Sequence, residues 1–233
     1  YKAFFLETLA KYHIELKQIK SIILTHFHSD HTGLVKWLVK ELDIPVYASC
    51  LAVPRIAHDE MYLNNKVTIY EELYKQYGIL QYAETRMNKL RQTYEKRHEL
   101  RLDINLMSLR EGDKVAGLTV LSTPGHSPDS ISFYDVETGW LFGGDVLFEN
   151  GLASALLEYD ERESIRAAYV DYFATLVTLK QKEISMIFPG HRNPFSNYEE
   201  IIDRAMNKVE YKIEKVLKHI RAGHHTVEQL GIT

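Results

Sequence analysis

The spacing of hydrophobic residues alternates between helical and extended patterns along the first fifty residues. Apolar side chains at 4–12 and at 34–42 recur near the 3.6-residue period of a helix. Each of these segments is followed by a short apolar run rich in β-branched residues, at 22–24 and at 44–48, which is typical of a buried strand. The alternation of helix and strand predicts an α/β protein.

A different pattern occupies residues 56–101, where Glu, Lys, Arg, Gln and Tyr dominate and proline is absent. Helical spacing at 67–77 and at 82–98 predicts a two-helix insertion into the α/β framework. Such an insertion either covers a site as a lid or forms a solvated hairpin without contact to substrate. The sequence leaves both alternatives open.

Strands return in the second half of the chain. Apolar runs between turns predict a helix at 164–181 and strands at 118–121, 131–134, 140–142 and 184–188. The chain is helical from residue 201 onward, and a capping box at Thr226–Gln229 begins one more helix. We therefore expect a main domain over 1–205 and a helical tail over 206–233. The tail is either the start of a winged-helix-like unit or a plain docking helix.

Composition excludes several classes of protein. The 233 residues are 45% hydrophobic and 26% charged, which is ordinary for a globular domain that buries a substantial core. The formal charge of −4 does not favour nucleic acid or an anionic membrane as a partner, although local basic patches keep nucleic acid open. No apolar run reaches membrane-spanning length and no leader is visible, so we expect a cytoplasmic protein. The sequence begins at Tyr1 and not at methionine. A single cysteine excludes an internal disulfide, and the oligomeric state stays open.

Four side chains able to bind a metal follow the first predicted strand within six residues, at His26, His28, Asp30 and His31. Residues two apart in an extended segment project to the same side, so His26 and His28 can bind one ion. Asp30 and His31, on the following turn, can reach a second ion. Packing gives no reason to gather these groups, and their desolvation is unfavourable unless a cation lies among them.

Three more candidate ligands follow later strands, at His126, Asp145 and His191. His126 lies in a Pro/Gly loop, Asp145 follows two glycines, and His191 follows the sequence Pro-Gly. Each of them alone would be an ordinary loop residue. Because each follows a strand, strands packed in register would bring all three to one edge.

Together these residues resemble the metallo-β-lactamase superfamily, whose H-x-H-x-D-H motif matches residues 26–31, preceded by the usual threonine at Thr25. The resemblance implies an αββα sandwich with the site at one edge of two sheets. It implies that His26, His28 and His126 hold a first metal, that Asp30, His31 and His191 hold a second, and that Asp145 bridges both. Two Zn²⁺ ions per chain are expected, with Mn²⁺ or Fe as alternatives. The family's opening strands have no counterpart before the first predicted helix, so the chain departs from the family pattern there.

The resemblance implies a metal-dependent hydrolase that acts on a small-molecule substrate through a hydroxide bridging two metals, with Asp30 or Asp145 orienting the hydroxide and moving its proton. The loop Thr123-Pro124-Gly125-His126 resembles that of glyoxalase II-like thioesterases, which favours a thioester, a lactone or another small ester. An alternative is an RNA or phosphodiester hydrolase with the same metals, which the basic C-terminal helix supports. A second alternative is a mononuclear iron dioxygenase of the persulfide-oxidising type. The sequence contains no G-x-S-x-G motif, P-loop or dinucleotide fingerprint that would indicate another class.

Overall fold

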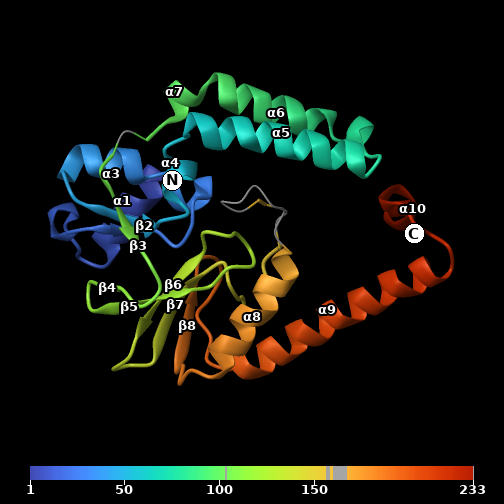
Figure 1. The fold of residues 1–233 in the computed structure, drawn as a ribbon. Helices are drawn as coiled ribbons and strands as arrows, with labels where there is room; N and C mark the ends of the chain where they lie inside the picture. The colour runs from blue at the N-terminus through green and yellow to red at the C-terminus, as the bar shows by residue number, and fades with distance from the viewer. Residues whose placement is uncertain (103, 156–157, 160–166, 233) are drawn as a thin grey trace.

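Two β-sheets, each covered by helices on its outer face, form the centre of the molecule (Figure 1). This computed structural model describes residues 1–102, 104–155, 158–159 and 167–232. The first sheet is parallel, and its strands in spatial order are β1 (Ile22–Ile23), β2 (Val46–Ser49) and β3 (Leu106–Leu109). The predicted α/β class and the αββα sandwich are confirmed.

The second sheet is mixed, and its spatial order follows the sequence. Its strands are β4 (Lys114–Val115), β5 (Leu118–Ser122), β6 (Ile131–Asp135), β7 (Trp140–Gly144) and β8 (Met186–Pro189). The first four strands pair antiparallel, and β8 joins β7 in parallel after a helical crossover. The strands predicted around residues 118, 131, 140 and 184 are therefore present, with boundaries shifted by a few residues.

Helices cover both sheets on the sides that face away from each other (Figure 1). The first sheet is accompanied by α1 (Lys2–Lys11), η1 (Leu16–Gln18), α2 (Ser29–Thr32), α3 (Val35–Leu42) and α4 (Val53–Ile56). The second sheet packs against α8 (Ala168–Lys180) and α9 (Tyr198–Arg221). The first residues of the helix expected at 164–181, namely 164–166, lie outside the described residues.

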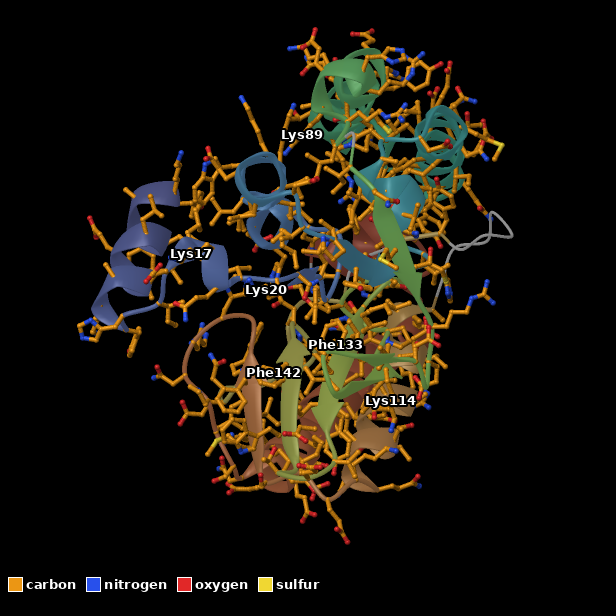
Figure 2. The ribbon with its side chains drawn as sticks, turned by 90° about the vertical axis from the view of Figure 1, so that its left-hand side faces the viewer. Lys17, Lys20, Lys89, Lys114, Phe133 and Phe142 are labelled. Atoms are coloured by element: carbon orange, nitrogen blue, oxygen red, sulfur yellow. The ribbon has the colours of Figure 1, made fainter. Side chains whose placement is uncertain are left out.

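Successive side chains of a strand point to opposite faces of its sheet, so each sheet contributes to two layers of the core. Leu24, Val46 and Ala48 point toward α3 and α4, whereas the neighbouring Ile23 and Tyr47 point toward the second sheet. Between the sheets these two residues meet an apolar set made of Leu109, Val115, Val120, Ile131, Phe133 and Phe142. Two of that set, Phe133 and Phe142, lie where the sheets meet in Figure 2. Burial on both faces of each sheet holds the strand ends of the two sheets in one fixed arrangement.

The predicted insertion forms a helical hairpin that projects beyond the first sheet (Figure 1). It contains α5 (Glu60–Gln76), η2 (Leu80–Tyr82), α6 (Glu84–Glu95) and α7 (Arg97–Leu100). α5 begins earlier than the helical spacing predicts because the Asp59 carboxylate accepts a hydrogen bond of 2.9 Å from the backbone N–H of Tyr62 and caps the helix. The hairpin has its own small core around Tyr70, Tyr74 and Met87.

The C-terminal tail continues the long helix α9, which spans the expected boundary at residue 205, so the division into two domains stays a prediction. The predicted capping box is confirmed: the Thr226 hydroxyl accepts from the Gln229 N–H, and the Gln229 side chain accepts from the Thr226 N–H, at the start of α10 (Val227–Ile232). None of the helices in the described part of the chain combines the length and apolar composition needed to cross a membrane.

Candidate metal centre

The structure brings all the candidate ligands together at one edge of the sandwich. They come from the loop after β1, from α2, and from the loops that follow β5, β7 and β8. Their ligand atoms fall into overlapping groups in which every atom lies within 4.8 Å of the others. The groups are His26 with His28 and His126, His26 with His31 and Asp145, and Asp30 with His31 and His191.

The first group consists of three imidazoles around a common point. His28 Nδ1 lies 2.9 Å from His26 Nε2 and 3.0 Å from His126 Nε2. His126 Nδ1 lies 2.7 Å from the carbonyl oxygen of Ser154 and donates to it, which leaves Nε2 directed at the group. This is the ligand set that the family resemblance implies for a first metal.

The second group is more exposed. His191 Nε2 lies 3.2 Å from Asp30 Oδ2, and His31 Nε2 lies 3.8 Å from the same oxygen. Two imidazoles and a carboxylate at these distances match the set that the resemblance implies for a second metal.

Asp145 lies between the two groups. Its Oδ1 is 3.3 Å from His31 Nε2, and its Oδ2 is 3.7 Å from His126 Nε2 and 3.6 Å from His191 Nε2. The carboxylate therefore contacts members of both groups, as a bridging ligand must. The role of each residue as a ligand stays a prediction of the sequence, which this geometry supports.

The protonation of the site fits divalent cations. Burial, followed by the charges of the neighbouring imidazoles, lowers the pKa of His26 to about 2, and burial with the nearby His126 lowers the pKa of His28 to about 4. Both imidazoles are neutral near pH 7, which is the form that binds a metal. Burial alone would raise the pKa of Asp145, but the adjacent His31, His26 and His191 outweigh it and lower the pKa, so this carboxylate is ionised.

Among the buried side-chain atoms that have no hydrogen-bond partner within the described residues, two belong to candidate ligands, His31 Nε2 and Asp145 Oδ1, and they lie 3.3 Å apart. Leaving such atoms unpaired in the interior costs about 1–3 kcal/mol each, unless a ligand satisfies them. A cation bound between them would satisfy both. The donor set of nitrogen and carboxylate oxygen without thiolate suits Zn²⁺, Mn²⁺ or Fe.

Close backbone approach is what allows these loops to converge. A Cβ at Gly190 would lie 2.5 Å from Asp145 Oδ1 and 2.7 Å from His31 Cε1, so only glycine fits between these side chains. Gly144 has a φ of +54°, and a Cβ there would lie 2.7 Å from the Cβ of Thr25. The residue before Asp145 therefore packs against the residue before His26.

Sequence reasoning missed one residue that holds the site together, the buried Asp129. Its carboxylate accepts a hydrogen bond of 2.8 Å from the backbone N–H of Phe27, between two candidate ligands, and another from the hydroxyl of Ser127, next to His126. Burial raises the pKa of Asp129, and the hydrogen bond from Ser127 opposes this shift. The sequence feature that could have indicated Asp129 is its position in the same Pro/Gly loop as His126, three residues downstream.

We expect Asp129→Ala to lower the free energy of unfolding of the metal-free protein by about 2 kcal/mol, because it leaves the partly buried Phe27 N–H without its partner. Metal affinity should also fall by roughly tenfold, as for other residues that orient ligands. Urea denaturation and chelator competition measure these effects. The matched control is Asp113→Ala, which removes an exposed carboxylate that accepts from the Arg110 N–H; equal losses in both variants would contradict this role.

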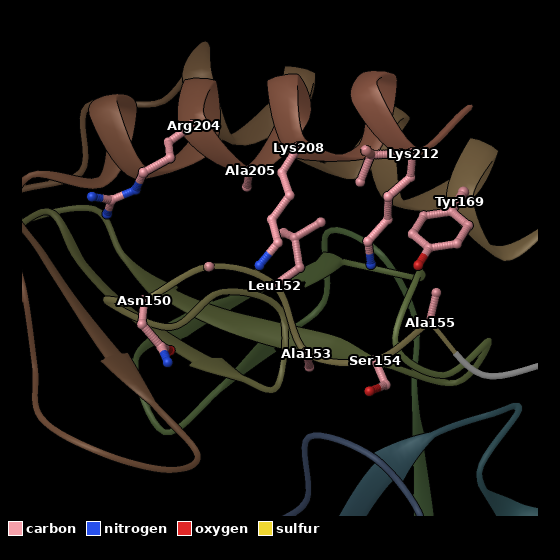
Figure 3. A pocket seen from close by; sticks show the side chains of 12 residues that line it. Asn150, Leu152, Ala153, Ser154, Ala155, Tyr169, Arg204, Ala205, Lys208 and Lys212 are labelled. Carbon is pink, nitrogen blue, oxygen red and sulfur yellow. The ribbon is translucent and has the colours of Figure 1, made fainter. Parts of the chain in front are cut away.

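Two cavities border this edge of the sandwich. One, of about 580 Å³, reaches from His28, Ser29 and Thr32 to the helical insertion. The other, of about 440 Å³, lies between α9 and the loop around residues 150–155 (Figure 3). In Figure 3 the side chains of Arg204, Lys208 and Lys212 extend from α9 toward this loop.

Comparison with known proteins defines the class of this fold and site. The model of the metallo-beta-lactamase superfamily matches residues 2–191, and the chain belongs to this superfamily. The crystal structure of metallo-beta-lactamase family protein TTHA1429 from Thermus thermophilus has the same fold, with a TM-score of 0.72 and 24% identity over 96% of this chain and 71% of that one.

Among curated relatives, the probable metallo-hydrolase YqjP of Bacillus subtilis is 27% identical over 90% of this chain. The match covers 66% of that relative's length, so the chain spans slightly less than two thirds of it. A hydroxyacylglutathione hydrolase of Bdellovibrio bacteriovorus is 26% identical over 57% of this chain and 36% of its own length.

Proposed function

We propose that this protein is a hydrolase that uses two metal ions to cleave a small thioester, ester or lactone. The observation that carries the proposal is the placement of Asp145 between two groups of ligands, one of imidazoles only and one that includes Asp30. The similarity to a hydroxyacylglutathione hydrolase, which by its name acts on a thioester, supports thioesters within this range. When bound, such a pair of cations lowers the pKa of water toward about 7 and polarises the oxygen of a scissile carbonyl.

The two carboxylates of the site, Asp145 and Asp30, differ in burial, and we assign them different roles on that basis. Asp145 is buried and fixed by its neighbours, so it orients groups between the two ligand sets. Asp30 is exposed and lies 3.2 Å from His191 Nε2, so its carboxylate can accept a proton from the reacting water and pass it to solvent. Phe27 and residues of the helical insertion line the cavity next to His28, which supports a role of the insertion in covering the substrate.

Metal removal gives the direct test. Dialysis against a chelator should abolish hydrolysis of thioesters, with a loss of at least about 10³-fold, and zinc or manganese should restore it. The assay uses a panel of a thioester, a lactone and a phosphodiester on zinc-loaded and on manganese-loaded protein, together with metal analysis. Turnover that persists in the metal-free protein would refute the proposal, and one iron per chain with oxygen consumption would favour a dioxygenase instead.

A phosphodiester such as RNA is the second candidate substrate, since α9 directs Arg204, Lys208 and Lys212 toward the loop that supports His126. Cations that follow a nucleic acid backbone make binding fall steeply with salt. Turnover of the phosphodiester that exceeds thioester turnover and declines steeply between low and moderate salt would favour this candidate.

A further inference from the structure

The larger cavity joins the candidate metal centre to the helical insertion. One wall carries His28, a member of the first ligand group, and the opposite wall is formed by residues of α5 and α6, including Leu63, Lys89 and Leu90. A molecule in this cavity would therefore contact the metal centre at one end and the insertion at the other. The cavity along α9 is lined by none of the seven candidate ligands.

The charge of this cavity is opposite to that of the protein. Its lining includes Lys36, Arg55, Lys66 and Lys89, and no carboxylate among the described residues, although the chain carries a formal charge of −4. A concave surface with one sign of charge concentrates ligands of the opposite sign.

Two of these cations are already partly compensated. Lys66 is buried and forms an ion pair of 3.0 Å with the buried Glu158. Arg55 is only 6% exposed and donates to the carbonyl oxygens of Leu51 and Tyr159, but its Nε has no hydrogen-bond partner among the described residues.

The other two cations are available. Lys36 on α3 and Lys89 on α6 are exposed, and neither forms an ion pair within the part of the chain that the structure describes. Lys36 and Lys89 can therefore pair with a negative charge on a bound ligand, and the buried Arg55 adds positive charge to the cavity wall.

Between the cations the lining is apolar. Phe27, Leu63, Leu90 and Leu102 contribute hydrocarbon surface, and Tyr62 adds an aromatic ring. Burial raises the pKa of Tyr62, and the neighbouring Glu158 raises it further, so this ring stays uncharged. Apolar walls with a few cationic groups are complementary to a molecule that has both a hydrocarbon part and an anionic end.

We propose that this cavity binds the acyl part of the substrate and that this acyl chain ends in an anionic group, a carboxylate or a phosphate. The hydrocarbon part packs on Phe27 and the leucines, and the anionic end pairs with Lys36 and Lys89, with the positive charge of the buried Arg55 behind the cavity wall. This inference rests on the proposed function, because it places the scissile carbonyl at the His28 end. It selects, within the small esters and thioesters, those with an anionic acyl chain.

The test compares thioesters that share one acyl length and end in a carboxylate, a phosphate or a neutral primary amide. We expect the zinc-loaded protein to hydrolyse one of the anionic compounds with a kcat/KM at least about tenfold above that of the amide. The carboxylate and phosphate arms identify the anion. Dissociation constants of the matching non-hydrolysable thioethers, measured by calorimetry, should show the same preference and should weaken with salt.

Lysine variants assign the preference to this cavity. Lys36→Gln and Lys89→Gln should each reduce it by about threefold and the double variant by about tenfold, since each removes one exposed charge. Lys114→Gln is the matched control, because Lys114 is exposed on β4, far from Lys89 in Figure 2. Lys208→Gln and Lys212→Gln test the rival cavity along α9.

The outcomes separate the two proposals. Equal turnover and equal binding of anionic and neutral compounds would overturn this inference while leaving the proposed function in place. A preference that is lost in Lys208→Gln or Lys212→Gln, and kept in Lys36→Gln and Lys89→Gln, would also overturn it. Binding that prefers the anion, without hydrolysis of any thioester, ester or lactone by the metal-loaded protein, would refute the proposed function and retain the anion site.

Discussion

Asp145→Ala is expected to lose bound metal and hydrolytic activity together, with turnover reduced by about 10³-fold or more. The reason is geometric, because this single carboxylate contacts His31 at 3.3 Å and His191 at 3.6 Å, and also lies 3.7 Å from His126. Its removal also leaves neighbouring imidazoles without their negative partner, so divalent cations bind a site with one ligand and one charge fewer. Metal analysis after gel filtration and a thioester assay measure the two losses.

Two further variants make this result specific. His126→Ala should likewise reduce metal content and turnover, because it removes one of three imidazoles from the first group. Asp203→Ala is the control, since Asp203 is an exposed carboxylate that pairs with Lys180 on the surface, and we expect it to keep its full metal content. Unchanged metal content in both Asp145→Ala and His126→Ala would refute the assignment of these residues as ligands.

Gly190→Ala is expected to damage the site almost as severely, although it changes no candidate ligand. The added methyl group would lie 2.5 Å from Asp145 Oδ1 and 2.7 Å from His31 Cε1, distances that real Cβ atoms do not adopt. Asp145 and His31 must therefore move, and we expect metal affinity to fall by roughly 10- to 100-fold, as it does when ligands are displaced. Competition with a chromogenic chelator measures the affinity.

A matched glycine shows whether this loss comes from the contact. A Cβ added at Gly231 in α10 would meet nothing within 4 Å, so Gly231→Ala should leave metal affinity unchanged. Circular dichroism of Gly190→Ala should still show the helices and sheets, because the clash is confined to the site. If Gly190→Ala binds metal as tightly as the wild type, the prediction is wrong. The loop after β8 would then be able to shift away from Asp145 and His31 without loss of metal affinity.

Much of the fold could be predicted from local patterns, because most strands are short apolar runs in which the majority of residues are at least partly buried. The runs beginning at residues 22, 118, 131 and 140 are strands in the structure, and the polar, tyrosine-rich segment at 56–101 is helical. The start of α5 was missed because it depends on the Asp59 cap and not on hydrophobic spacing. The pairing of β1, β2 and β3 into one sheet and of β4 to β8 into another is a property of the whole chain, which local spacing does not contain.

The sequence by itself determined which side chains are candidate ligands, and the resemblance to the family predicts how they divide between two metals. Four of the seven candidate ligands lie within six residues, so their proximity follows from the length of the chain alone. Only the tertiary structure decided that His126, Asp145 and His191 reach the same edge, since loop convergence requires two packed sheets and glycine at position 190. The tertiary structure likewise decided that the Asp129 carboxylate accepts a hydrogen bond from the Phe27 N–H. It also placed Lys36, Arg55 and Lys89 around one cavity, because these contacts join segments far apart in sequence.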